Sequence, residues 1–155
     1  YDSFVWTIVG YLAQLGAVLA GPAATIERAW REKHLFGGAM RQAGIVAAAG
    51  VYALDHHVER LADDHARARR LAEAWHAAGL PVDLEQVETN FVQLDVGRIG
   101  LGRDEAIALL REVGVGLSST IHPTVLRAVT HLDVTDDDID RASALVPEAL
   151  AAARV

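Results

Sequence analysis

The stretch Asn90-Phe-Val-Gln-Leu-Asp95 is the part of this sequence that decides the fold. Phe91, Gln93 and Asp95 fall on one side of an extended chain, and the apolar residues between them fall on the other. This two-residue period is typical of a β-strand that buries one face and leaves the other open. The stretch therefore predicts a sheet that is covered on one side.

Two more strands and two helices are predicted around this stretch. Strands are expected at Val82–Leu84 and Leu126–Thr130, and helices at Arg103–Val113 and Asp136–Ala153. The order strand, strand, helix, strand, helix indicates an α+β fold with helices on one face of an antiparallel sheet.

An amphipathic helix is predicted upstream of the sheet, from Asp55 to Ala78. Gly79 and then Pro81 end it, since glycine favours the conformation that closes a helix and proline cannot continue one. The helix carries one stripe that is expected to face the core, made of Val58, Leu61, His65, Ala68, Leu71, Ala72 and Trp75.

The first 54 residues contain short strands and an unusually apolar helix. Strands are expected at Ser3–Ile8 and Leu15–Leu19, and a helix at Ala23–Arg31. The paired glycines of Leu35-Phe-Gly-Gly38 predict a loop with positive φ or close backbone approach. The helix predicted at Ala39–Leu54 is apolar on all sides, which indicates that it packs against another helix and that the protein is a homo- or hetero-oligomer.

Composition excludes several classes of function. Among 155 residues, 14 Lys and Arg face 21 Asp and Glu, and the net charge of −7 argues against nucleic-acid binding. The absence of cysteine excludes disulfides, thiolate catalysis and zinc–sulfur sites, and is consistent with a cytoplasmic protein. The apolar run Ile8–Gly21 contains Gln14 and is too short for a membrane anchor. Because the chain begins at Tyr1 rather than at methionine, we expect that further residues precede it.

Four stretches resemble the threonine aldolase family and follow one another in the family's order. They are Gly16–Gly21, Gly37–Gly44, Asp55–Leu61 with Asp64-His65, and Arg127–Asp133. The most specific strings are Gly-Gly-Ala-Met-Arg-Gln and Arg-Ala-Val-Thr-His-Leu-Asp, which helix or strand propensity alone would not generate.

The resemblance implies a β-eliminating lyase of fold type I that uses pyridoxal phosphate (PLP). Such an enzyme cleaves or forms the Cα–Cβ bond of β-hydroxy amino acids. Residues 1–54 would supply the last strands and helices of its large domain, and residues 55–155 its small carboxyl-terminal α+β domain. The family's amino-terminal half, which carries the phosphate loop, the aromatic group over the PLP ring and the aspartate for the pyridinium nitrogen, is not among these residues.

The cofactor lysine of the family is missing from this sequence. Counting from the two ends of the matching segment places it at Val9 or Gly10, and neither residue carries an amine. Lys33 is the one lysine of the chain, and it belongs to a different element, where a solvated charge is the ordinary interpretation. The resemblance therefore implies PLP as cofactor without covalent attachment to this chain, and no catalytic residue is assigned.

Three cationic side chains are candidates for binding. Arg127 stands where the resemblance implies an arginine for the substrate α-carboxylate, although a strand-end salt bridge is an alternative. Arg41, expected at the amino end of a helix, would approach the PLP phosphate, or else it would satisfy buried backbone groups at a helix interface together with Gln42. His34 would assist the same anion when protonated, or else it is an exposed loop histidine.

No metal or hydrolase site is expected. His57 and His65 are eight residues apart, and the adjacent residues Asp55 and His56 face different sides of a helix. His131 is expected to share a strand face with a carboxylate, but no nucleophile is placed beside it.

Two functions therefore stay open. One is a threonine-aldolase-like lyase part that is inactive alone and acts on a small amino acid only when PLP and its lysine are supplied by a partner. The other is a non-catalytic homologue, a pseudoenzyme that serves as an assembly or regulatory subunit.

Overall fold

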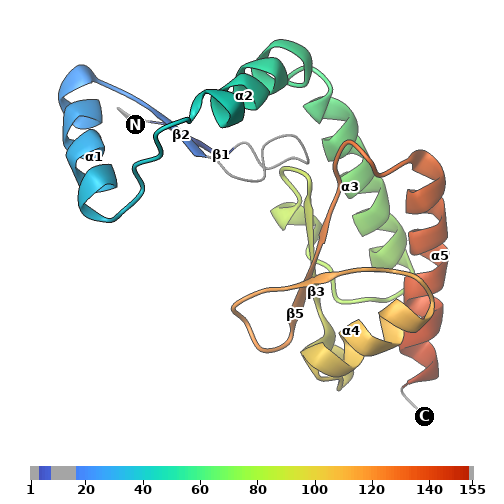
Figure 1. Ribbon diagram of the computed structural model, residues 1–155. Coiled ribbons are helices and arrows are strands. Elements are labelled where there is room, and N and C mark those ends of the chain that lie inside the picture. The colour runs from blue at the N-terminus through green and yellow to red at the C-terminus, as the bar shows by residue number, and fades with distance from the viewer. Residues whose placement is uncertain (1–3, 8–16, 154–155) are drawn as a thin grey trace. The chain divides into compact units, whose positions relative to one another are not determined.

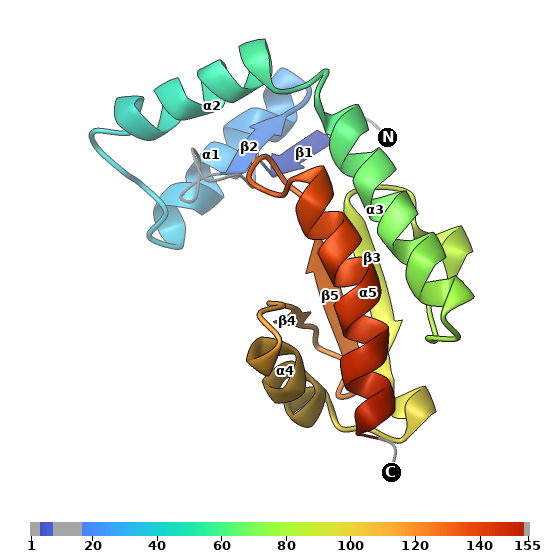
Figure 2. The same cartoon turned by 90° about the vertical axis from the view of Figure 1, so that its right-hand side faces the viewer.

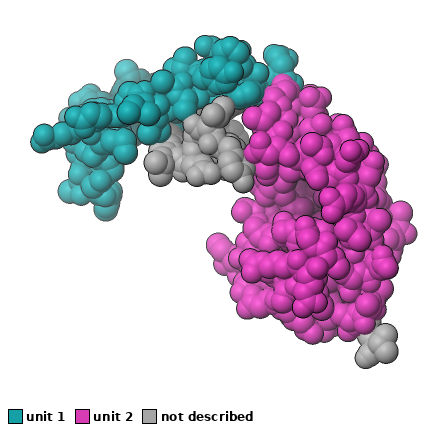
Figure 3. Space-filling view, turned by 45° about the vertical axis from the view of Figure 1, so that its right-hand side comes forward, with its two compact units in different colours: residues 1–59 teal, residues 60–155 magenta. Residues whose placement is uncertain are grey.

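The computed structural model describes residues 4–7 and 17–153, and the chain divides into two compact units. Unit 1 is Tyr1–Glu59 and unit 2 is Arg60–Val155, as the colours of Figure 3 show. The assignment of residues 1–54 and 55–155 to two domains of a larger fold stays a prediction.

Unit 1 begins with a pair of strands. β1 (Phe4–Thr7) pairs antiparallel with β2 (Ala17–Ala20), close to the two strands predicted from the sequence. Helix α1 (Ala23–Leu35) follows and is longer than predicted. After its end, Gly37 adopts a φ of +76°, which suits glycine, and the Gly38 amide donates to the carbonyl of Lys33. The predicted glycine loop is therefore confirmed.

Helix α2 (Gly44–His56) completes unit 1 and differs from its prediction. A helix was expected from Ala39, but residues 41–43 form a turn, so Arg41 precedes the helix instead of opening it. Gly50 is the only buried residue of α2, and Ile45 is 83% exposed. Within the described part of unit 1, most apolar side chains of α2 are exposed.

Unit 2 is built on a three-stranded antiparallel sheet of order β3-β5-β4. β3 (Phe91–Asp95) and β5 (Val125–Val129) confirm two of the predicted strands, and β4 (Ser118–Ser119) was not predicted. Together with the helices, this sheet confirms the α+β class.

Three helices accompany the sheet: α3 (Leu61–Ala77), α4 (Arg103–Glu112) and α5 (Asp136–Ala152). α3 and α5 lie side by side in both views of the ribbon (Figures 1 and 2). Trp75 of α3 is fully buried, and its indole Nε1 donates to the carbonyl oxygen of Ala142 in α5 at 3.1 Å. Burying one large apolar side chain contributes about 1.5–3 kcal/mol, so this contact helps to fasten the two helices.

The apolar core lies on one face of the sheet. In β3 the buried residues are Val92 and Leu94, and in β5 they are Leu126 and Ala128. The intervening residues are exposed or half-buried, so the opposite face of the sheet is open within the described residues of unit 2. The alternation read from the sequence is therefore confirmed.

The prediction of one helix from Asp55 to Ala78 was wrong in its first turns. The chain turns at residues 57–60, and α3 begins at Leu61. Val58 therefore lies outside α3 and is exposed. Leu61 and His65 are within α3 but are also exposed, while Asp64 between them is buried with Ala68, Leu71, Ala72 and Trp75.

The predicted strand Val82–Leu84 was also wrong. The chain instead forms a 3-10 turn at Leu84–Gln86. The Asp83 carboxylate accepts a hydrogen bond from the backbone amide of Glu85 at 3.0 Å, which stabilises this turn at the expense of an extended chain.

Candidate functional site

Arg127 lies in the middle strand of the open sheet face. In the register of the sheet its Cα is opposite Gln93 of β3 on one side and Ser118 of β4 on the other. Opposed residues of an antiparallel pair share a face, so these three side chains emerge together on the side away from the core. Arg127 itself is half-buried.

Two neighbours contact the side chain of Arg127. Its Nε donates a hydrogen bond of 3.3 Å to the hydroxyl oxygen of Ser118, and its Cζ lies 5.2 Å from the centroid of the Phe91 ring. The Ser118 hydroxyl in turn donates to the backbone carbonyl of Arg127 at 3.1 Å. The guanidinium is thus held on one side by a hydroxyl and on one face by an aromatic ring.

The terminal nitrogens of Arg127 have no partner within residues 4–7 and 17–153. No hydrogen bond from Nη1 or Nη2 is formed there, and no carboxylate makes an ion pair with this arginine. A guanidinium with two parallel N–H groups free can hold a carboxylate in a bidentate arrangement. Within the described residues, the terminal edge of this guanidinium is thus left without a protein partner.

The other two candidates belong to unit 1. His34 is in the last turn of α1, where its Nδ1 lies 2.8 Å from the carbonyl oxygen of Trp30 and its ring centroid lies 5.0 Å from the Trp30 ring. Arg41 is exposed in the turn before α2 and makes no hydrogen bond or ion pair with any residue that the structure describes. A shared anion between the two stays a prediction.

Lys33 lies on α1 and contacts an aromatic ring of the same helix. Its Nζ lies 5.2 Å from the centroid of the Trp30 ring, which is a cation–π contact. Positions 9 and 10, where the resemblance places the cofactor lysine, lie outside the described residues. Lys33 is thus an α1 surface charge, as the sequence indicates, and it belongs to a segment distinct from those two positions.

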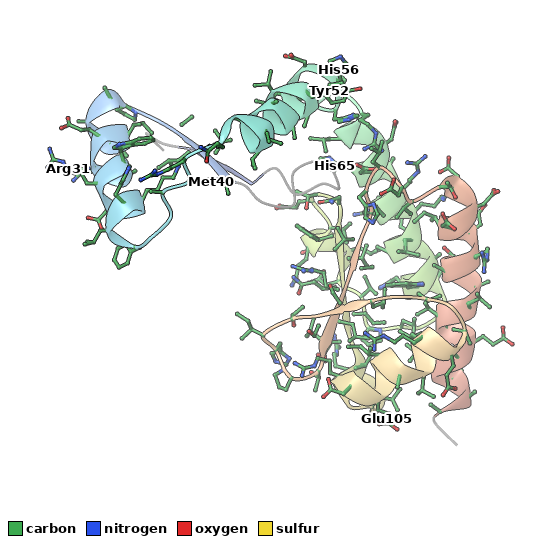
Figure 4. All side chains as sticks on the ribbon, viewed as in Figure 1. Arg31, Met40, Tyr52, His56, His65 and Glu105 are labelled. Carbon is green, nitrogen blue, oxygen red and sulfur yellow. The ribbon has the colours of Figure 1, made fainter. Side chains whose placement is uncertain are left out.

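Two histidines at the end of α2 contact the ring of Tyr52. Figure 4 shows Tyr52 and His56 together near the end of this helix, and their ring centroids are 4.1 Å apart. His57 meets Tyr52 edge-on at 5.6 Å. Within the described part of the chain, no three His, Asp or Glu side chains are grouped as metal ligands would be.

A cavity of about 210 Å³ opens in unit 2 away from Arg127. It lies between α5, the segment 114–117 and the end of β5, and its lining is mostly apolar. The polar groups of Thr130 and Asp138 in the lining already have partners, namely the carbonyl of Asp64 and the hydroxyl of Thr135. Arg141 also lines the cavity, so the lining is mostly apolar but includes one cationic side chain.

Sequence reasoning found Arg127 but missed the residues that contact it. Ser118 is in a two-residue strand that carries no pattern, and it reaches Arg127 only through the sheet register. Phe91 was placed on the correct face by alternation, but nothing in the sequence paired it with Arg127. No helix within the described ranges is both long and apolar enough to cross a bilayer.

Comparison with known proteins gives a family, several relatives and a fold. The family model described as beta-eliminating lyase matches residues 5–97. The low specificity L-threonine aldolase of Escherichia coli strain K12 is 37% identical over 145 residues, which is 92% of this chain and 41% of that protein. The probable low-specificity L-threonine aldolase 2 of Arabidopsis thaliana is 37% identical over 136 residues, or 84% of this chain and 37% of that protein.

Among solved structures, 8-amino-7-oxononanoate synthase from Francisella tularensis has the same fold. The TM-score is 0.71 at 17% identity, and the match covers 97% of this chain and 46% of that chain. The chain thus spans less than half the length of each of these proteins.

Proposed function

The chain belongs to the beta-eliminating lyase family, and from this premise we propose that it is the carboxyl-terminal part of a threonine-aldolase-like lyase that is inactive by itself. The reaction proposed for the whole enzyme is cleavage or formation of the Cα–Cβ bond of a β-hydroxy amino acid. The likeness to low specificity L-threonine aldolases supports this reaction class.

The observation that carries the proposal is the environment of Arg127. Its Nη1 and Nη2 atoms bond to none of the residues that the structure describes, while Ser118 and Phe91 contact the rest of the guanidinium. We assign to Arg127 the binding of the substrate α-carboxylate, since a planar fork fits a carboxylate better than a flexible ammonium does. In this role the chain orients the substrate and performs no bond cleavage.

The family implies PLP as cofactor, and this chain does not fit its covalent attachment. PLP withdraws electrons from Cα, but it is held in such enzymes by a lysine amine, which Val9 and Gly10 lack. The ammonium group of Lys33 lies over the Trp30 ring in α1, so we do not propose that Lys33 replaces the cofactor lysine. We therefore propose no reaction step through PLP for this chain alone.

Arg41 and His34 are proposed as residues that attract an anion such as the PLP phosphate. Both are exposed in unit 1, on either side of the Gly37-Gly38 loop. Because Arg41 precedes α2 in a turn, its guanidinium would act as a mobile charge instead of adding to the amides at the helix start.

A second candidate function is an assembly or regulatory subunit without catalysis. The observation that favours it is α2, most of whose apolar residues are exposed within the described part of unit 1. An apolar helix of this kind is stable in water when another protein surface covers it. We propose a homo- or hetero-oligomer under both functions, in the cytoplasm and with no nucleic-acid partner.

Binding of L-threonine tests the proposed role of Arg127. We expect saturable binding by calorimetry or NMR titration to the unmodified chain, weakened at least tenfold by Arg127→Gln and partly by Arg127→Lys, which keeps the charge but loses the fork. Arg98→Gln is the matched control, because Arg98 is an exposed arginine of unit 2. Equal binding by the unmodified chain and Arg127→Gln would remove the assignment.

A further inference from the structure

The Ser118 hydroxyl both donates a hydrogen bond to Arg127 and accepts one from it. Its O–H donates to the backbone carbonyl of Arg127 at 3.1 Å, and its oxygen accepts from Nε of the same arginine at 3.3 Å. The two bonds fix the side chain against its own backbone, since a hydroxyl has one donor and lone pairs that accept. Ser118 belongs to β4, which consists of two residues at the edge of the sheet.

Phe91 restrains the same guanidinium from a second strand. The Arg127 Cζ is 5.2 Å from its ring centroid, and the ring is 40% exposed. Phe91 is opposite Val129 in the register, two positions along β5 from Arg127, so the arginine side chain leans along the sheet to reach the ring. Ser118 thus occupies the Nε edge of the guanidinium, and the Phe91 ring contacts one of its faces.

We propose that Ser118 and Phe91 are positioning residues that leave Arg127 only its terminal Nη1–Nη2 edge for a ligand. A carboxylate then binds end-on to this edge, because the alternative Nε–Nη2 edge is occupied by Ser118. The inference rests on the proposed function of Arg127 and adds the geometry with which it receives the carboxylate. The ligand class is a compact α-amino carboxylate, for which L-threonine is the probe.

The free protein tests the positioning without any ligand. In chain labelled with ¹⁵N-arginine, the Nε–Hε signal of Arg127 is assigned by its loss in Arg127→Gln. We expect this proton to exchange with water at least about threefold faster in Ser118→Ala, because a hydrogen bond of ordinary strength protects it. Ser118→Thr, which retains the hydroxyl, restores the slow exchange. Ser119→Ala is the matched control, since Ser119 is the other residue of β4 and is opposite Leu126 instead of Arg127.

Titration with L-threonine tests the end-on geometry. We expect Ser118→Ala and Phe91→Leu each to weaken binding about two- to tenfold, while thermal unfolding changes little because both residues are outside the core. Ser118→Thr and Ser119→Ala bind like the unmodified chain.

The outcomes separate this inference from the proposed function. If Ser118→Ala exchanges its Arg127 proton as slowly as the unmodified chain, or if bound L-threonine displaces Ser118 from Nε, the positioning is wrong. If the exchange pattern appears as expected and no variant or unmodified chain binds L-threonine, the positioning holds and the carboxylate role of Arg127 fails.

Discussion

The hydroxyl of Thr130, the residue after β5, donates a 2.7 Å hydrogen bond to the backbone carbonyl of Asp64 in the first turn of α3. Thr130 is 2% exposed, and its backbone amide also donates to the carbonyl of Asn90 beside β3. The end of the strand that carries Arg127 is therefore fixed both to the helix and to the neighbouring strand.

Replacing Thr130 by valine should destabilise unit 2 by about 1 kcal/mol. Valine has nearly the same shape, so the loss is that of one buried hydrogen bond, and the carbonyl of Asp64 loses this partner. Urea unfolding followed by tryptophan fluorescence measures the free energy of unfolding. Thr89→Val is the control, because Thr89 is an exposed threonine shortly before β3. An equal effect of both changes would show that the bond contributes nothing specific.

A second prediction concerns the contribution of the Asp64 side chain to the stability of unit 2. This buried carboxylate accepts two hydrogen bonds from Arg60, at 3.0 and 2.9 Å, in the turn that precedes α3. Asp64→Asn should lower the free energy of unfolding by about 2–3 kcal/mol, since it removes a charged partner from a mostly buried arginine.

Glu73→Gln provides the comparison for Asp64. Glu73 forms the same type of i,i+4 pair with Arg69 in α3, but both side chains are about half exposed. Its loss should cost at most about 0.5 kcal/mol. Similar effects of the two substitutions in urea unfolding would contradict the importance given to burial of Asp64.

Acid should destabilise unit 2 through Asp136. The hydrogen bonds from Arg67 and its positive charge lower the pKa of Asp136 below its ordinary value of 3.8. A carboxyl group with a lowered pKa in the folded state stabilises the fold above its unfolded pKa and loses this contribution as the pH falls through the lower folded value. The contribution of Asp136 is thus complete above about pH 5, starts to fall as the pH approaches 3.8, and is lost once the pH is below the lower folded pKa.

The measurement is the pH dependence of urea unfolding for the unmodified chain and Asp136→Asn. The difference between the two should be largest at neutral pH and should shrink below pH 4. Asp137→Asn controls for the loss of one negative charge at the start of α5, because Asp137 has no hydrogen bond to Arg67. A difference for Asp136→Asn that stays constant with pH would contradict the linkage.

The apolar surface of α2 predicts association. Ile45→Glu should shift the chain toward monomer at micromolar concentration in sedimentation velocity, because a charge is costly to bury in an apolar interface. Ile121→Glu is a matched control, since Ile121 is a fully exposed isoleucine in a loop of unit 2. A monodisperse monomer for the unmodified chain, or equal behaviour of all three, would show that α2 is not an interface.

Local sequence patterns were sufficient to predict the helices and strands whose buried residues recur with a regular period. The alternation in β3 and the apolar side of β5 predicted both strands to within one residue, and Gly79, with φ of +80°, ends α3 near the predicted position. Local patterns failed where contacts with residues far away in the sequence determine which side chains are buried. Asp64 is buried because Arg60 and Thr130 contact it, and Thr130 comes 66 residues later.

The candidate site shows the same limit. Arg127 was recognised by resemblance, but its partners Ser118 and Phe91 reach it through the register of three strands, which no local pattern contains. Val82–Leu84 was mistaken for a strand because three residues are too few to distinguish an extended chain from the turn that Asp83 stabilises. The roles of Arg41 and His34 stay predictions.

The most direct test of the account is cleavage of L-threonine by the purified chain with added PLP. Release of glycine and acetaldehyde is measured for the unmodified chain, Val9→Lys and Gly10→Lys against PLP without protein. We predict no release above this background for any of the three, because an amine alone does not supply the concerted placement of groups that stabilises a transition state. Turnover by the unmodified chain would contradict the claim that it is inactive alone, and turnover by a lysine variant alone would show that the missing amine is the whole deficiency.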